Sequence, residues 1–377
     1  MNILFITHTD SLGGANRSLL QLIKGLKEYG KDINILVVLP HGGDDFTAEL
    51  IKLDCRYMRY RFASCVTVSG SKAYIINYLR GRLRYRKVLK EVRTLRVDII
   101  HTNSSICDLG MYLADRIHVP HVWHVRENLD YYDMRYIFRN RIKKLMESDL
   151  NHVVCISKYI KRYIDSGFCI RDSRVIYNGF TIPDGHKKHE SNGFHNLIVA
   201  GMIYKNKGQM DAIEAVHMLV NKYGRNDVCL YVVGMQPSTK QYESELMDYV
   251  KEHHIEQYVK LMPFTPKLDE IRDKCDIALQ CSVMEGMGRI TIESMLRKLL
   301  VIGARSGATV ELIDEGRNGW MYEPGNSEEL AERINYVLNY DGREFVRDSA
   351  YEWAKANFDN RMITESFVKL YEELLAG

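Results

Sequence analysis

The chain alternates, from one end to the other, between short runs rich in β-branched residues and longer amphipathic stretches. Between the first two runs, for example, "NRSLLQLIKGLKEYG" carries apolar residues at helical spacing. This alternation predicts parallel sheets covered by helices on both faces. The strand-like runs of the first half are NILFIT, INILVVL, VDIIHT, PHVWHV, HVVCI and SRVIYN.

The alternation stops once, between Asn178 and Asn196, where glycine, proline and charged residues concentrate, and then restarts with NLIVAGMI. A chain of 377 residues is too long for one compact core. We therefore expect two Rossmann-like α/β domains facing an interdomain cleft, with ligands at the carboxyl ends of the strands. The expected domains are residues 1–185 and 186–357, and a closing helix, about 358–377, is expected to pack back on the first domain.

The composition excludes several other classes of protein. No run of 18 apolar residues appears, so no membrane-spanning helix is expected, and MNILFITHTD is interpreted as a first strand and not as a signal peptide. The eight cysteines form no CxxC pair, which indicates neither a zinc site nor a disulfide framework. Reduced thiols are typical of a cytoplasmic protein, and the sequence predicts that location.

Basic residues concentrate in the first half. Residues 1–190 hold 31 lysines and arginines against 20 acids, whereas residues 191–377 hold 21 against 29. Between Arg56 and Arg96 there are 12 basic residues and one acid, and RYIFRNRIKK forms a second basic run. This charge favours peripheral contact with the anionic inner face of a membrane, although a solvated basic face has the same composition. No nucleic-acid partner is expected, because no nucleic-acid motif accompanies the charge.

The stretch CSVMEGMGRITIESMLRK holds two glutamates, Glu285 and Glu293, separated by seven residues. In one continuous helix they would lie about 12 Å apart along the axis, too far to share a proton or a metal. The glycines of MEGMG favour a turn, which places Glu285 after a strand and Glu293 in the first turns of a helix. Backbone N–H groups near Gly288, Arg289 and Ile290 would then form a phosphate site with a carboxylate on each side to accept sugar hydroxyls. The alternative is that both glutamates decorate an ordinary helix surface.

The segment EGMGRITIESM resembles the E-x7-E motif of retaining glycosyltransferases of family 4 (glycosyltransferase group 1), which have the two-domain GT-B fold. The resemblance extends along the whole chain, with the segments in the family's order and spacing. The other segments are SLGGANRSLLQL, VDIIHTNS, WHVRE, VCISKYIKR, VIYNGF, GMIYKNKGQMDAIEA and GARSGATVELIDEGRNGWMYEPGN.

The resemblance implies three catalytic residues. Glu285 would contact hydroxyls of the donor sugar, Lys207 would neutralise the departing diphosphate, and His124 would face the sugar near the reacting carbon. From the residues alone, Lys207 is also compatible with a solvated lysine at a helix start, and His124 with a histidine of the core.

The resemblance also implies a donor-binding set. Glu293 would hold the ribose hydroxyls, and Gly13 and Gly14 would let the backbone approach the donor phosphate. Phe264 and Thr265 would meet the base. The loop between the glutamates would contact the sugar and the diphosphate through Gly286, Met287, Gly288, Arg289 and Ile290.

Two positions depart from the family pattern. Met202 stands where the family often has an arginine that helps to bind the diphosphate, so that Arg289 or Arg305 would supply the charge or binding would be weaker. Asn16 replaces an acidic residue common in the glycine loop, which would bear on the sugar or the acceptor.

Together these features predict a retaining glycosyltransferase that needs neither a metal nor another cofactor, because no acidic or cysteine partner completes a ligand set with His121 and His124. It would move a hexose-type sugar from a UDP-linked donor to a hydroxyl of a glycan or lipid-linked acceptor, in bacterial surface polysaccharide synthesis. The alternatives are a sugar-nucleotide epimerase or phosphorylase on the same fold and a non-catalytic partner subunit that binds nucleotide sugars. A nicotinamide dehydrogenase is disfavoured, because HTDSLGGANRS lacks G-x-G-x-x-G.

Overall fold

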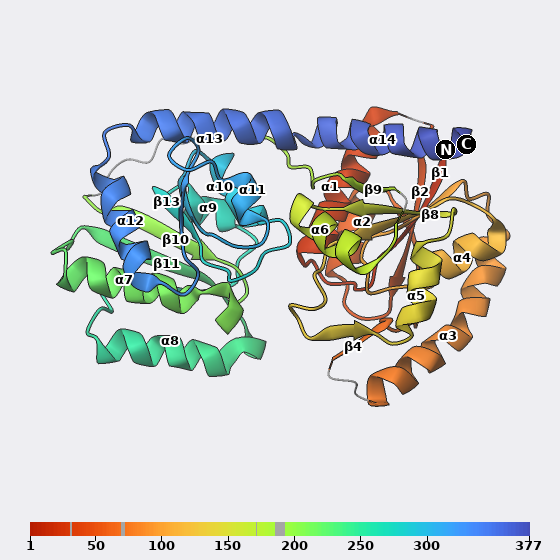
Figure 1. The fold of residues 1–377 in the computed structure, drawn as a ribbon, viewed down its shortest axis with the longest axis horizontal. Coiled ribbons are helices and arrows are strands. Elements are labelled where there is room, and N and C mark those ends of the chain that lie inside the picture. Colours follow the sequence, from red (N-terminus) through yellow and green to blue (C-terminus); the bar gives the residue numbers. More distant parts are fainter. Residues whose placement is uncertain (31, 69–71, 171, 185–192) are drawn as a thin grey trace. The chain divides into compact units, whose positions relative to one another are not determined.

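The computed structural model describes residues 1–377 except 31, 69–71, 171 and 185–192. The chain forms two compact units, which Figure 1 shows as ribbons. The amino-terminal unit comprises Met1–Thr181 and Phe358–Gly377, and the carboxy-terminal unit comprises Ile182–Asn357. The boundary expected between residues 185 and 186 falls outside the described residues, a few positions beyond this division.

The amino-terminal unit is built on a seven-stranded sheet in the order β3-β2-β1-β5-β6-β8-β9. Every neighbouring pair in this sheet is parallel, so the carboxyl ends of all its strands lie at one edge. The strands are β1 (Asn2–Ile6), β2 (Asn34–Pro40), β3 (Arg56–Tyr60), β5 (Ile99–Thr102), β6 (His121–Val125), β8 (Asn151–Cys155) and β9 (Ser173–Val175).

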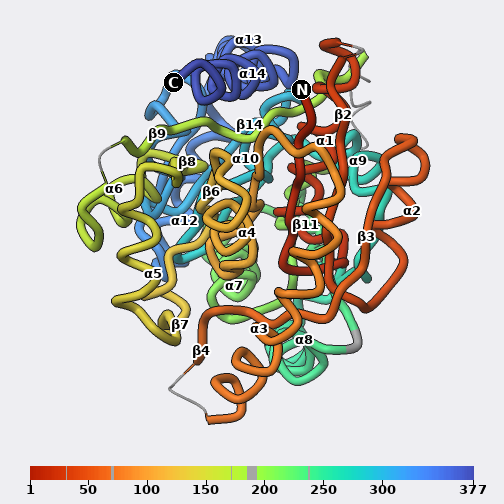
Figure 2. The backbone as a smooth tube through the Cα atoms, turned by 90° about the vertical axis from the view of Figure 1, so that its right-hand side faces the viewer, coloured from red at the N-terminus to blue at the C-terminus, as the bar shows by residue number. Residues whose placement is uncertain are grey.

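Helices cover both faces of this sheet. Successive side chains of β1 point to opposite faces, and they belong to two different hydrophobic clusters. Ile3 and Phe5 belong to a cluster with residues of α1 and α14, whereas Leu4 and Ile6 belong to a cluster with residues of α3 and α4. Figure 2 shows the start of α3 beside β4, which pairs with β7 in a separate antiparallel ribbon. These elements are α1 (Gly14–Tyr29), α2 (Asp45–Lys52), β4 (Val66–Val68), α3 (Lys72–Val92), α4 (Leu109–Ile117), β7 (Met134–Tyr136), α5 (Arg139–Met146), α6 (Lys158–Gly167) and α14 (Asn360–Ala376).

The last helix, α14, packs against the first, α1. A Cβ added at Gly25 of α1 would come within 2.0 Å of the Thr364 hydroxyl and 2.9 Å of the Asn360 amide nitrogen, so the two helices touch where α1 has no side chain. The Asn360 side chain also donates to the Gln21 carbonyl at 2.9 Å. The closing helix is therefore part of the core of the amino-terminal unit.

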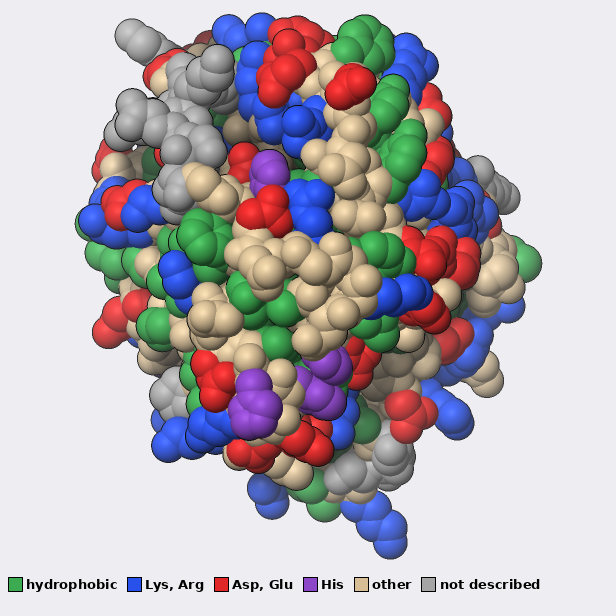
Figure 3. Space-filling model, turned by 90° about the vertical axis from the view of Figure 1, so that its left-hand side faces the viewer, with side chains coloured by type: hydrophobic (Ala, Val, Ile, Leu, Met, Phe, Trp, Pro, Cys, Tyr) green, Lys and Arg blue, Asp and Glu red, His purple; other side chains and the backbone are tan. Residues whose placement is uncertain are grey.

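The carboxy-terminal unit has a six-stranded sheet in the order β12-β11-β10-β13-β14-β15, again parallel throughout. On the face drawn in Figure 3, which lies at the left of Figure 1, acidic and basic side chains are interspersed. The strands are β10 (His195–Ala200), β11 (Val228–Met235), β12 (Val259–Pro263), β13 (Ile277–Gln280), β14 (Leu300–Ala304) and β15 (Trp320–Tyr322).

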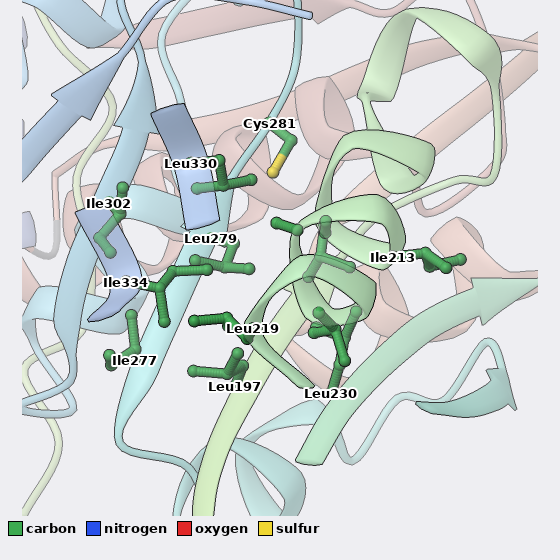
Figure 4. Packing of buried hydrophobic residues seen from close by; sticks show 14 of the residues in the cluster. Leu197, Ile213, Leu219, Leu230, Ile277, Leu279, Cys281, Ile302, Leu330 and Ile334 are labelled. Atoms are coloured by element: carbon green, nitrogen blue, oxygen red, sulfur yellow. The ribbon is translucent and has the colours of Figure 1, made fainter. Parts of the chain in front are cut away.

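Apolar side chains from the strands and from α7 and α12 fill one hydrophobic cluster in this unit, part of which Figure 4 shows. Leu197 of β10 lies beside Leu219 of α7, and Ile277 of β13 lies beside Ile334 of α12. The architecture confirms the fold class predicted from the sequence, two Rossmann-like α/β units with parallel sheets. The helices are η1 (Lys205–Lys207), α7 (Gln209–Asn221), η2 (Pro237–Thr239), α8 (Lys240–Glu252), α9 (Leu268–Arg272), α10 (Arg289–Met295), α11 (Thr309–Leu312), α12 (Ser327–Asn339) and α13 (Arg343–Phe358).

Candidate functional site

An ion pair joins two of the expected catalytic residues in the carboxy-terminal unit. Glu285 lies in the loop between β13 and α10, and its carboxylate pairs with the Lys207 ammonium at the end of η1. Ser282 Oγ donates to the same carboxylate oxygen at 2.8 Å. Because β10 and β13 are parallel neighbours, the loops that follow them meet at the carboxyl edge of the sheet. This edge therefore brings together side chains that lie far apart in the sequence.

The backbone around Gly208 fixes this approach. Gly208 has a φ of +65°, and a Cβ there would lie 2.1 Å from the carbonyl oxygen of Cys281. A side chain would thus force the lysine turn away from the end of β13. The backbone N–H of Val283 also donates to the Asn206 carbonyl at 3.0 Å, which joins the two loops next to Lys207 and Glu285.

Glu293 projects from α10 and pairs with two arginines. Its two carboxylate oxygens accept from Arg272 Nη2 at 2.5 Å and from Arg289 Nη2 at 2.8 Å. Burial alone would raise the pKa of Glu293, but the charges and hydrogen bonds of Arg272 and Arg289 outweigh burial and hold the pKa below its ordinary value. Glu293 is therefore a fixed, ionised carboxylate. Each of its oxygens has a second lone pair that can accept a further hydrogen bond.

The helix α10 begins where the glycine turn predicted it to begin. Gly288 is its N-cap residue, with a φ of +76°, and Arg289 is the first helical residue. The turn thus separates Glu285 in the loop from Glu293 in the helix. The loop is held in place by the Ala308 N–H, which donates to the Glu285 carbonyl at 2.9 Å.

The other residues of this unit that were expected to bind the donor differ in how far their side chains are exposed. Met287 is 3% exposed, so its side chain belongs to the core and only its backbone can meet a ligand. Phe264 is 49% exposed, and its N–H donates to the Met235 carbonyl at 2.9 Å. The Thr265 hydroxyl accepts from the Lys267 N–H at 3.1 Å. Gly286 and Ile290 are half-buried.

The two arginines expected to compensate for Met202 each have an acidic partner. Arg289 pairs with Glu293 at 2.8 Å, and Arg305 Nε pairs with Glu323 at 3.0 Å. Met202 itself is 45% exposed. Both Arg289 and Arg305 are therefore already paired with a carboxylate in this structure.

His124 lies on β6 in the amino-terminal unit and is buried under α14. Its ring centroid is 5.3 Å from that of Phe367, and its Nδ1 is 3.2 Å from His101 Nε2 and 3.3 Å from Arg126 Nη2. Burial, with the neighbouring charges of Arg126 and His101, lowers the pKa of His124 well below its ordinary value, so the imidazole is neutral. Its Nε2 has no hydrogen-bond partner in the described part of the chain. His124 is thus a core histidine that keeps one ring nitrogen unpaired.

The same sheet edge holds Arg126 and Glu127, which the sequence reasoning did not select. Arg126 is buried, and it donates through Nε to the Asn103 carbonyl at 3.0 Å and through Nη1 to Asn178 Oδ1 at 2.7 Å. The Glu127 carboxylate accepts from the hydroxyl of Ser104 at 2.7 Å. An arginine followed by a glutamate, directly after the strand-like run HVWHV, is the one sequence signal that could have marked this position.

The glycine loop after β1 is fixed by Asn16. The Asn16 amide nitrogen donates to the carbonyls of Thr9 at 2.9 Å and Ser11 at 2.7 Å, inside the unit. Asn16 thus shapes the loop from within. Gly13 and Gly14 are exposed where α1 begins, and the backbone of Gly13 is in an ordinary extended conformation.

Two properties concern metals and membranes. Within the described ranges, no group of three or more histidine, cysteine or acidic side chains is placed to hold a metal ion. Both ring nitrogens of His121 are engaged, by Asn151 at 2.6 Å and by Thr102 at 2.7 Å. No helix in the part of the chain that the structure describes is long and apolar enough to cross a membrane.

The chain thus folds into two parallel α/β units, and ligands of such folds bind at the carboxyl ends of the strands. Two family models match consecutive parts of the chain: "Glycosyltransferase Family 4" over residues 12–182 and "Glycosyl transferases group 1" over residues 182–353. The chain belongs to glycosyltransferase family 4 and has the GT-B fold. The family suggested by the sequence motifs is thereby confirmed.

Several known proteins are similar to this one over most of their length. An uncharacterized glycosyltransferase of Methanocaldococcus jannaschii, MJ1178, is 25% identical over 79% of this chain and 81% of its own. The capsular polysaccharide biosynthesis glycosyltransferase CapM of Staphylococcus aureus is 20% identical over 59% of this chain and 62% of its own. The crystal structure of Anabaena HepE with UDP and glucose has a TM-score of 0.82 at 22% identity, covering 99% of this chain and 100% of HepE.

Proposed function

We propose that this glycosyltransferase moves a hexose-type sugar, with retention of configuration, from a UDP-linked donor to a hydroxyl of a glycan or lipid-linked acceptor. The observation that carries the proposal is the pairing of Lys207 with Glu285 beside the start of α10. HepE, which shares the fold, has been crystallised with UDP-glucose, and this supports the choice of a UDP-linked hexose. CapM, by its name, acts in capsular polysaccharide synthesis, and this supports a role in surface polysaccharide synthesis.

In the proposed mechanism, Lys207 and the first N–H groups of α10 stabilise charge on the departing diphosphate. A diphosphate beside Lys207 would replace Glu285 as partner of the ammonium. The Glu285 carboxylate would then accept hydrogen bonds from hydroxyl groups of the donor sugar, for which a carboxylate is a strong acceptor. An oxygen of the donor phosphate takes the proton of the attacking hydroxyl, so no protein base is required.

The proposal gives the two glutamates different tasks, which isothermal calorimetry and kinetics can separate. Glu293→Gln should weaken the binding of UDP, because Glu293 is proposed to hold the ribose hydroxyls. Glu285→Gln should lower kcat and sugar selectivity while leaving the Kd for UDP nearly unchanged. Glu293 also pairs with Arg272 and Arg289, so both variants are compared well below their unfolding temperatures. Equal losses of UDP affinity in the two variants would contradict this division.

The nucleotide and the sugar can be identified by a thermal-shift panel of nucleotide sugars, because a ligand that binds the folded state raises Tm with the logarithm of its saturation. Product analysis with donor alone separates an epimerase, which needs no acceptor, from a transferase. The exposed Met202 favours one alternative, a non-catalytic partner subunit, because diphosphate binding would lack a cation there. Donor binding without turnover on any acceptor would support that alternative, and rapid transfer would exclude it.

We further propose that the acceptor is met at the inner face of a membrane, where lipid-linked glycans are held. The basic composition of residues 1–190 supports this location, since cations gather at anionic lipid surfaces. Full activity on a free oligosaccharide, unaffected by attaching it to a lipid, would argue against it.

A further inference from the structure

The helix α3 exposes apolar side chains where a helix on a protein surface usually exposes polar ones. Ile76, Leu79 and Leu83 are spaced by three and four residues, which places them on one face of the helix. They are 48%, 46% and 75% exposed. A surface helix normally buries such a stripe.

The opposite face of α3 is fixed to the amino-terminal unit by a buried polar cluster. The hydroxyls of Tyr78 and Tyr85 donate to the two carboxylate oxygens of Asp108 at 2.6 and 2.7 Å, and Arg82 Nη1 donates to Asp108 at 2.7 Å. Asp108 is fully buried at the start of α4. The helix therefore cannot roll to bury Ile76, Leu79 and Leu83 without breaking these bonds.

Basic side chains surround the exposed apolar stripe. Its one acidic neighbour on the helix, Glu91, accepts a hydrogen bond from the Tyr60 hydroxyl. In the described part of the chain, none of the exposed bases of α3 forms an ion pair. These bases are Lys72, Arg80, Arg84, Arg86, Lys87 and Lys90.

We propose that this solvent face of α3 (Ile76, Leu79 and Leu83 with the six surrounding bases, called the α3 face below) docks on the surface of an anionic lipid bilayer. A helix with an apolar stripe between cations lies in the plane of the membrane interface, where the apolar groups enter the acyl boundary and the cations meet lipid phosphates. The proposal deepens the proposed function, because it names the surface through which the protein would reach a membrane-held acceptor.

Charge distinguishes this occupant from a second copy of the chain. Two α3 faces in contact would set their unpaired cations against one another, and like charges that meet across an interface disfavour the complex. A nucleic acid would satisfy the cations but leave the leucines exposed, because phosphate contacts come from polar and charged side chains. An anionic bilayer satisfies both kinds of side chain.

Co-sedimentation with vesicles tests the proposal on the full-length protein. We expect binding to vesicles of phosphatidylcholine with 30–50% phosphatidylglycerol (roughly the anionic range at which cationic surfaces respond), little binding to pure phosphatidylcholine, and weaker binding as salt shortens the Debye length. Each cation near such a surface contributes about fivefold to binding, so Arg80→Glu/Arg84→Glu should weaken it at least about 25-fold. Leu79→Ser/Leu83→Ser should weaken it about tenfold, because two apolar groups no longer leave water.

Matched controls carry the same changes elsewhere. Lys240→Glu/Lys251→Glu makes the same charge reversal on α8, whose sequence KQYESELMDYVKE holds acids as well as lysines. Ile51→Ser removes an apolar side chain that is 62% exposed on α2. Both controls should bind vesicles like the parent protein, and far-ultraviolet circular dichroism and thermal unfolding check that all variants fold.

Three outcomes would overturn the proposal. The first is equal binding to neutral and anionic vesicles, and the second is equal weakening of vesicle binding by the α3 and α8 charge reversals. The third is a parent protein that binds no vesicles but forms a dimer that Leu79→Ser/Leu83→Ser loses, which would assign the α3 face to a second copy. Donor binding, measured by thermal shift in the same preparations, distinguishes failure of the membrane proposal from failure of the proposed function. Vesicle binding without donor binding would contradict the proposed transfer reaction but still support membrane docking through the α3 face.

Discussion

The two units have the same architecture but hold charged groups at the carboxyl edges of their sheets in opposite ways. In the carboxy-terminal unit, Glu285 pairs with Lys207, and Glu293 pairs with two arginines. In the amino-terminal unit, burial keeps His101 and His124 neutral beside the buried Arg126. The first arrangement keeps carboxylates ionised by pairing them with cations, and the second keeps two imidazoles uncharged in a core. The difference supports the proposal that the carboxy-terminal unit stabilises the charge of a departing diphosphate.

Removing the lysine charge should have the largest effect. We expect Lys207→Ala to lower kcat by about 10²–10³, the usual loss when one preorganised contact to a developing negative charge is removed. Steady-state kinetics with a UDP-sugar measures this effect. The matched control is Lys205→Ala in the same short helix, because Lys205 pairs with Glu245 and its side chain is 73% exposed. A similar loss in both variants would mean that the loop, and not the charge, matters.

Acidification should destabilise the two units over different pH ranges. Burial lowers the pKa of His101, His121 and His124 below their ordinary value of about 6.5, to about 3 for His121. Between the folded and unfolded pKa values the unfolded chain binds more protons, so this stability is present above about pH 6.5 and is lost as pH falls toward the folded pKa values. Lowering the pH from 7 to 5.5 should cost the amino-terminal unit roughly 1 kcal/mol per histidine, about 3 kcal/mol in all.

The carboxy-terminal unit should lose stability only at a lower pH. The pKa of Glu293 is lowered by its arginines, so its contribution is present above about pH 4.5 and is lost only as pH falls through the folded pKa. His195 and His217 also have lowered pKa values, but they are partly exposed and should contribute less. Hydrogen exchange, corrected for the intrinsic effect of pH, resolves the two units. An equal loss of amide protection in the two units between pH 7 and 5.5 would contradict the expected difference in their sensitivity to acid.

Filling the contact between α1 and α14 should destabilise the amino-terminal unit alone. Gly25→Ala places a methyl group against Thr364 and Asn360, and overpacking of this kind costs about 1–3 kcal/mol despite the better helix propensity of alanine. Urea unfolding followed by hydrogen exchange assigns the loss to a unit. Gly30→Ala is the control, since no atom lies within 4 Å of the added methyl group. Unchanged stability in Gly25→Ala would show that α14 can move away from α1 at little cost.

The smallest effect is expected at the glycine loop. Asn16→Asp replaces an amide that donates two hydrogen bonds by a carboxylate that can only accept, so the carbonyls of Thr9 and Ser11 lose their donor. The expected loss is about 1–2 kcal/mol of stability, measured by urea unfolding, with faster exchange of the loop amides. A fully active and equally stable Asn16→Asp variant would contradict this expectation and show that an acidic residue can replace Asn16 without loss.

Local pattern was enough to predict the fold and the place of the two glutamates. The glycines of MEGMG correctly predicted the end of one element and the start of α10. The strand β3 was not predicted, because Arg56 and Arg59 of this edge strand carry charges that are usually found outside sheets. The partners of Glu293 were also missed. Arg272 lies on another helix, and only the folded sheet brings its guanidinium to that carboxylate.

The place of α14 has a consequence for how the protein is made. The amino-terminal unit takes a core helix, with Phe367 and Tyr371, from residues that follow the carboxy-terminal unit in the sequence. The sheet of this unit leaves the ribosome first, yet the face that packs on α14 stays uncovered until α14 has been translated, after every residue of the carboxy-terminal unit. The unit that is translated first should therefore be the last to reach its native state. Premature termination a few residues before Asn360 should yield a chain with a native carboxy-terminal unit and an aggregation-prone amino-terminal one.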